Sequence, residues 1–145
     1  MAWRHNENKV KGKDGKKAAL KSRVFDDIPI GLLAFSGDEP IAWCSVGPRE
    51  SFRPLGGGEA LEGVWSIVCF FVKRPSRKRG ISALLIVEAA EYARRNGAQY
   101  LESYPADTDS PSYGFMGRRS TFERTGFRCC GRAGKRRSVM LRELV

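Results

Sequence analysis

Hydrophobic residues form their longest run in VWSIVCFFV, residues 64–72, where Ser66 is the one polar member. The β-branched and aromatic side chains of this run predict a strand buried on both faces, at the centre of a sheet. A different pattern follows in ISALLIVEAAEYARRNG, residues 81–97, which predicts an amphipathic helix with a left-handed cap at Asn96 and Gly97. The positions that recur at helical spacing are Ile81, Leu84, Leu85, Glu88, Ala89 and Tyr92.

Short β-prone runs between turn residues predict the remaining strands. They are PIGLLAF (29–35), EPIAWCSV (39–46), QYLESYP (99–105), FRCCGRA (127–133) and RRSVMLREL (136–144). The first two runs flank SGDE and the last two flank a turn at GKR, so each of these pairs is expected to form a hairpin.

Two further segments contain predicted helices: residues 12–25, expected to be a flexible start followed by a short helix, and residues 113–126, a helix that ends at Gly126. The inward side expected for the first helix consists of Ala18, Ala19 and Leu20. Residues 49–62 contain a glycine triplet and show no periodicity, which predicts a mobile loop.

The order of these elements indicates a mixed α/β (α+β) fold, with one central mixed sheet and helices on both faces. The strand–helix–strand unit across residues 64–103 predicts a right-handed parallel crossover. A length of 145 residues fits a single domain, residues 1–145. Within it, residues 1–24 form a basic N-terminal segment that is expected to be partly flexible or short-helical.

The composition, 41% hydrophobic and 29% charged, is that of a soluble globular protein. No apolar run reaches the roughly 18 residues of a membrane span. The first residues lack the apolar segment of a signal peptide, so a cytoplasmic location is expected. The four cysteines form no CxxC pair, which predicts reduced thiols and no metal site.

The formal net charge of +10 is concentrated in three clusters, at residues 1–23, 73–79 and 128–137. This distribution predicts a polyanionic partner, such as a nucleotide, RNA or an acidic surface. For the N-terminal cluster, docking onto a polyanion and ordinary solubilising charge fit the composition equally well. Nucleic acid is a partner that no recognisable binding motif supports.

The second cluster includes RPSRKRGIS, residues 74–82, between the central strand and the amphipathic helix. The free N–H groups and the dipole at a helix start favour anions. Gly80 allows close approach of a phosphate to the backbone, and Ser82 adds a hydroxyl donor. The loop also carries the basic side chains Arg77, Lys78 and Arg79. Because GxxxxGK[ST] and GxGxxG are absent, the alternatives are a phosphate cradle of another kind and a solvated basic turn.

The same segment resembles the acetyl-CoA signature [RQ]-x-x-G-x-[GA] of the GNAT superfamily of N-acetyltransferases. Arg77, Gly80 and Ser82 fall on its three key positions. Val72 ends the preceding strand five residues before Arg77, as the family usually has it. FERTGF, residues 122–127, resembles the family's [YF]-x-x-x-G-F. Segments such as MAWR, AWCSVGPRESF and LESYP look like a poorly characterised bacterial branch of this superfamily.

The resemblance implies a GNAT-like fold and transfer of an acetyl group from acetyl-CoA to an amine by direct attack in a ternary complex. In the family, backbone amides of the signature loop bind the pyrophosphate. The residues implied here are Arg77, Lys78, Arg79, Gly80, Ile81 and Ser82. The pantetheine arm follows the end of the central strand, here Phe70, Phe71 and Val72, where a backbone N–H polarises the thioester carbonyl. Relatives often dimerise, so a homodimer is a further expectation.

Three departures from the family pattern bear on activity. Ser82 replaces the usual Gly or Ala, Phe122 stands where many relatives carry a general-acid Tyr, and the N-terminal part is short. Tyr113 and Tyr104 are therefore candidates to protonate the leaving thiolate, and Glu62 is a candidate base acting through water. The alternative for each tyrosine is a packing role, and for Glu62 plain exposure to solvent.

The competing function is a non-catalytic acyl-CoA-binding or nucleic-acid-binding module on the same fold. Phe122 and the high net charge favour it. No segment identifies the acceptor, which is either a small-molecule amine or a protein amine.

Overall fold

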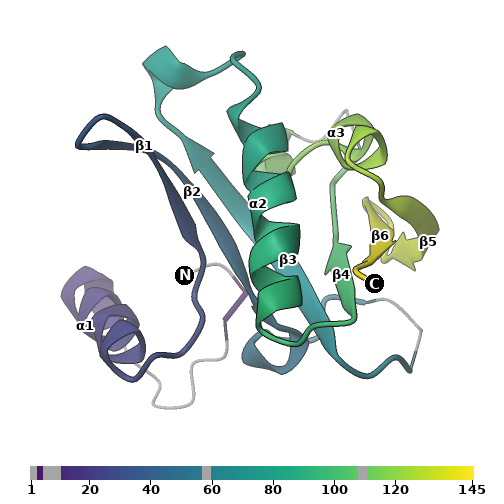
Figure 1. Ribbon diagram of the computed structural model, residues 1–145, viewed down its shortest axis with the longest axis horizontal. Helices are drawn as coiled ribbons and strands as arrows, with labels where there is room; N and C mark the ends of the chain where they lie inside the picture. Colours follow the sequence, from purple (N-terminus) through teal and green to yellow (C-terminus); the bar gives the residue numbers. More distant parts are fainter. Residues whose placement is uncertain (1–2, 5–10, 57–59, 108–110) are drawn as a thin grey trace.

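The computed structural model describes residues 3–4, 11–56, 60–107 and 111–145, with the side chains of residues 111–113 outside that description. Its centre is a six-stranded sheet in the order β1-β2-β3-β4-β6-β5 (Figure 1). The strands are β1 (Leu32–Ser36), β2 (Glu39–Pro48), β3 (Val64–Val72), β4 (Tyr100–Ser103), β5 (Arg128–Ala133) and β6 (Arg137–Glu143). Only β3 and β4 are parallel neighbours, so the mixed sheet, its central strand and both hairpins are confirmed.

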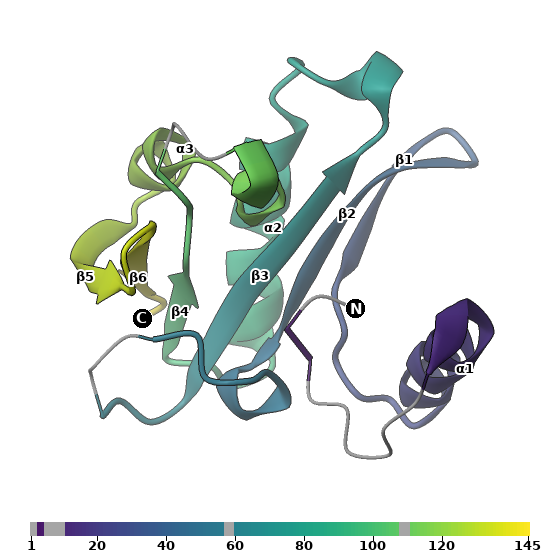
Figure 2. The ribbon, with the colours of Figure 1, turned by 180° about the vertical axis from the view of Figure 1, so that it is seen from behind.

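Helices cover the two faces of the sheet unequally. On one face lie α2 (Ile81–Arg95) and α3 (Arg119–Arg124), as Figure 1 shows. The other face carries the 3-10 helices η1 (Arg49–Ser51) and η3 (Pro111–Met116), as Figure 2 shows. A third 3-10 helix, η2 (Arg74–Ser76), follows β3 directly. No helix in the described part of the chain is long and apolar enough to cross a membrane.

The hydrophobic core has one part on each face of the sheet because successive side chains of β3 point to opposite faces. Ile67 packs in the part under α2, and Val68 packs in the part under η3. Residues 64–68 are all buried, which agrees with the strand buried on both faces, whereas Phe71 at the far end is exposed.

The buried side of α2 agrees with the predicted positions at Leu85 and Ala89, which are buried, but differs from them elsewhere. Leu84 is 56% exposed and Glu88 is exposed, whereas Ile86, Ala90 and Ala93 are buried. Alanine side chains let the helix pack close to the sheet, so the buried side is centred on them and the bulkier Leu84 turns to solvent. The end of the helix is as predicted, since Gly97 has a positive φ of 86°.

Two other predictions were wrong in detail. The helix α1 (Gly12–Phe25) is longer than predicted, because it includes the start that was expected to be flexible. It buries none of its residues, since it stands beside β1 and not on a face of the sheet (Figure 1). The inward side expected of Ala18, Ala19 and Leu20 is therefore absent. The helix predicted at 113–126 is divided into η3 and α3, since Gly117 between them has a φ of +84° that no helix accommodates.

The segment after β2 is more ordered than the predicted mobile loop. It opens with η1, and Phe52 and Leu55 are buried in the core under η3. Residues 57–59, which hold two of the three glycines of the triplet, lie outside the described residues.

The sheet splits where the parallel pair ends. β3 and β4 pair only over Val64–Ile67 and Tyr100–Ser103. Beyond Ser103 the chain follows β6, and the Ser138 N–H donates to the Pro105 carbonyl at 3.0 Å. β3 continues to Val72 with β2 as its strand partner, so residues 68–72 present a free backbone edge toward the gap (Figure 2).

Candidate functional site

A cavity of about 710 Å³ lies at this split, at the C-terminal end of β3. Its lining comes from the end of β3, the loop before α2, the first turns of α2, and the η3–α3 segment. Cavities of roughly 300–1,000 Å³ are usual for small-molecule ligands. Of the residues expected to bind acetyl-CoA, all but Arg79 line it: Phe70, Phe71, Val72, Arg77, Lys78, Gly80, Ile81 and Ser82.

The loop at the cavity mouth is built to expose backbone N–H groups. Lys78 and Gly80 both have left-handed backbones, with φ values of +60° and +77°. Gly80 is the N-cap of α2, and its carbonyl accepts the first helical hydrogen bond, from the Leu84 N–H at 3.1 Å. The N–H groups of residues 81–83 precede that bond and have no partner within the helix, and glycine has no side chain to cap them. Together with the helix dipole, they form a site for an anion.

Arg77 fixes this loop to the strand. Its Nε donates to the Val72 carbonyl at 2.9 Å, so the side chain spans the five residues between the strand end and the signature position. A Cβ on Gly80 would meet no atom within 4 Å, which leaves the approach to the backbone open. The loop is thus held in place by Arg77, and glycine is required at position 80 for its positive φ.

The charges around the cavity have one sign. Arg77 and Lys78 line one side, and Arg118 and Arg124 line another, with Thr121 between them on α3. Within the described part of the chain, no aspartate or glutamate lines the cavity. Sequence reasoning missed the two α3 arginines, because only the fold brings residues 118–124 opposite the loop at 77–80. The signal available in the sequence was the three-residue spacing of Arg118, Thr121 and Arg124, which places them on one side of a helix.

The three catalytic candidates are placed very differently. Tyr113 belongs to η3, whose neighbouring residues Gly114 and Phe115 line the cavity, but its own side chain is outside the described atoms. Tyr104 is buried and is not among the lining residues. Glu62 is exposed and precedes the first residue of β3, at the opposite end of that strand from the cavity.

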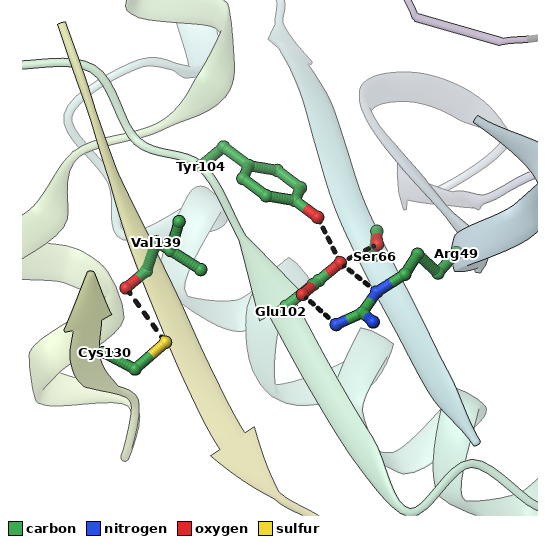
Figure 3. A network of polar contacts seen from close by, with 6 residues as sticks. All are labelled: Arg49, Ser66, Glu102, Tyr104, Cys130 and Val139. Atoms are coloured by element: carbon green, nitrogen blue, oxygen red, sulfur yellow. Dashed lines mark hydrogen bonds and ion pairs between the residues drawn. The ribbon is translucent and has the colours of Figure 1, made fainter. Parts of the chain in front are cut away.

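Tyr104 instead belongs to a buried polar network on the face of η1 and η3 (Figure 3). Its hydroxyl donates to the carboxylate of Glu102, which is 2% exposed. Arg49 donates to both carboxylate oxygens, from Nε at 2.7 Å and from Nη2 at 2.6 Å, and Ser66 Oγ donates at 2.9 Å. Desolvation, and next the charge of Glu102, raise the pKa of Tyr104. The tyrosine is therefore held as a neutral donor to the carboxylate.

This network was not predicted, and it lies on the other face of the sheet from Leu101, which belongs to the core under α2. The same view shows a second contact, from the Cys130 thiol to the Val139 carbonyl at 3.5 Å (Figure 3). The described residues contain no group of three His, Cys, Asp or Glu side chains suited to a metal ion.

Phe122, at the position of the family's tyrosine, is a packing residue. It is fully buried, and its ring lies 5.1 Å from that of Phe127 and 6.0 Å from that of Phe70. Of these three rings only Phe70 lines the cavity, so Phe122 and Phe127 pack behind its wall.

Comparisons with known proteins agree with this architecture. The model of the acetyltransferase (GNAT) family matches residues 2–122. No curated protein matches the chain in sequence.

Solved structures with the same fold share little sequence with the chain. An N-acetyltransferase of Staphylococcus aureus Mu50 matches 93% of this chain and 79% of its own, with 15% identity and a TM-score of 0.66. A Salmonella typhimurium structure with its cofactor acetyl-CoA matches 93% and 75%, at 14% identity and a TM-score of 0.65. The PaiA N-acetyltransferase of Thermoplasma acidophilum, in complex with coenzyme A, matches 89% and 70%, at 15% identity and a TM-score of 0.62.

Proposed function

The chain belongs to the GNAT acetyltransferase family, and we propose that it transfers the acetyl group of acetyl-CoA to an amine by direct attack in a ternary complex. The observation that carries this proposal is the cavity itself: a free strand edge that ends at an uncapped, cationic helix start. We further propose that residues 1–145 act as one domain, since both parts of the core share the same sheet.

The donor fits the described residues in two places. The N–H groups at the start of α2, with Arg77 and Lys78 beside them, suit the pyrophosphate. The free edge of β3 at Phe70, Phe71 and Val72 suits the amide groups of pantetheine, which hydrogen-bond as a neighbouring strand does. A backbone N–H of this edge would polarise the thioester carbonyl and stabilise the oxyanion that forms there.

Proximity of the amine to the thioester is then the main catalytic contribution. Among the described residues that line the cavity none is a carboxylate, so an amine that arrives deprotonated, or that loses its proton to water, fits this part of the lining. Tyr113 is the candidate we retain as the acid for the leaving thiolate, because its η3 neighbours line the cavity. Tyr104 and Glu62 are less suitable, one committed to Glu102 and the other at the far end of β3.

Calorimetric titration with acetyl-CoA tests donor binding. We expect saturable binding that Gly80→Trp abolishes, because the indole would occupy the mouth of the cavity. Gly97→Trp is the matched control, since Gly97 also has a positive φ and open space but does not line the cavity. The proposal fails if the unaltered protein does not bind acetyl-CoA at millimolar concentration, or if both variants bind equally.

Release of free thiol from acetyl-CoA with a panel of amines tests transfer. Tyr113→Phe should lower kcat with little change in KM, whereas Tyr100→Phe, at the opposite end of the parallel pair, should leave both unchanged. If donor binding persists but no amine accelerates thiol release, the protein is an acyl-CoA binder on the same fold.

One observation favours an additional polyanion-binding role. The helix α1 is rich in lysine and has no buried residue, and its exposed lysines present positive charge to a large anionic partner. A gel shift with RNA or DNA that weakens steeply with salt would support this role. Retention of the shift after deletion of residues 1–17 would exclude the N-terminal segment as its source.

A further inference from the structure

The side of the cavity formed by Arg118, Thr121 and Arg124, here called the α3 wall, carries positive charge apart from the loop proposed to bind the pyrophosphate. Arg118, Thr121 and Arg124 are spaced by three residues, so they lie on one side of this short helix, and all three line the cavity. The loop and α3 lie on opposite sides of the start of α2 in both views (Figures 1 and 2). The two groups of cationic residues therefore line different sides of the cavity.

The carboxylate of α3 does not neutralise these two arginines. Glu123 forms its ion pair with Arg119, at 2.8 Å, and Arg119 does not line the cavity. No ion pair in the described part of the chain involves Arg118 or Arg124. Like charges gathered around one cavity repel each other, and an anion bound between them relieves this repulsion.

We propose that Arg118, Thr121 and Arg124 form a second anion subsite, which binds the 3′-phosphate of coenzyme A. This inference rests on the proposed donor function, because it concerns the same cavity. Coenzyme A carries a diphosphate at the 5′ position and a phosphate monoester at the 3′ position of one ribose. The start of α2 suits the first group, and two guanidinium groups with a hydroxyl between them suit the second. The α3 wall thereby makes the 3′-phosphate a determinant of donor specificity.

Calorimetric titration with coenzyme A and with dephospho-coenzyme A tests the proposal. The unaltered protein should bind coenzyme A about tenfold more tightly, which is the order of magnitude for a charge-assisted hydrogen bond at an exposed site. In the Arg118→Gln/Arg124→Gln double variant the affinities for the two ligands should become about equal. The affinity for dephospho-coenzyme A should stay nearly unchanged, because only the contacts to the 3′-phosphate are lost.

Arg119→Gln is the matched control, since it removes one positive charge from the same helix outside the cavity, and it should keep the full preference. The two single variants, each verified as folded by circular dichroism, report the separate contributions. Equal affinities for the two ligands in the unaltered protein, or an undiminished preference in the double variant, would overturn the inference while the donor function stands. Absence of binding to both ligands would instead overturn the donor function, and the inference with it.

Discussion

Gly117→Ala should destabilise the protein through two separate effects at the floor of the cavity. Gly117 has a φ of +84°, which costs an alanine about 1 kcal/mol. A Cβ there would also lie 2.9 Å from Phe122 Cε2 and 3.1 Å from Phe70 Cε2, closer than carbon atoms pack. Both rings are buried, so the added methyl group overpacks the core around them. Overpacking of this kind lowers the free energy of unfolding by about 1–3 kcal/mol. The expected loss in the free energy of unfolding is therefore about 2–4 kcal/mol.

Gly97→Ala separates the two effects, because Gly97 has nearly the same φ, +86°, but no atom within 4 Å of its added Cβ. We expect it to cost only the conformational part, about 1 kcal/mol. Urea unfolding, followed by circular dichroism, gives both values. If the two variants lose the same free energy of unfolding, within about 0.5 kcal/mol, the rings do not close on Gly117 as described.

Three further predictions concern the buried network and the cavity. Glu102→Ala should lower the free energy of unfolding, measured with urea, by about 3 kcal/mol. It leaves the Ser66 and Tyr104 hydroxyls without their acceptor and Arg49 without the carboxylate it binds. Glu102→Gln should cost less. Because the pKa of Tyr104 is raised in the folded state, this group should leave the free energy of unfolding unchanged below pH about 10 and lower it above that pH. Tyr104→Phe should reduce the slope of the free energy of unfolding against pH by about one proton. Identical slopes in the two proteins would contradict the role assigned to burial. Ser82→Gly should retain acetyl-CoA binding within about threefold, since the backbone N–H groups and not the hydroxyl are the main donors, and a loss above tenfold in calorimetry would reverse that ranking.

The sequence predicted best where one strong local pattern decided the outcome. The nine-residue apolar run could only be an interior strand, and glycines at 97 and 126 ended helices as expected. The signature loop was found because its chemistry is contiguous, within nine residues. Its spacing from Val72 is realised as a hydrogen bond from Arg77 to that residue's carbonyl.

The failures arise where distant segments decide the local structure. The side of α2 that is buried depends on how closely its alanines approach the sheet, which periodicity alone does not give. Gly117 divides the last predicted helix because its backbone fits between the rings of Phe70 and Phe122, fifty-two residues apart in the chain. The partners of Glu102 come from three segments, so its burial as a paired carboxylate was not visible from its own strand.

We expect the cavity at the end of β3 to hold acetyl-CoA against the loop at residues 77–82. Titration of the isotope-labelled protein with acetyl-CoA, followed through its backbone amide resonances by NMR, tests this most directly. We expect saturable shifts in the amides of residues 70–72 and 77–83, and their loss in Gly80→Trp but not in Gly97→Trp. Unchanged resonances in this loop at saturating ligand, or shifts confined to α1, would contradict it.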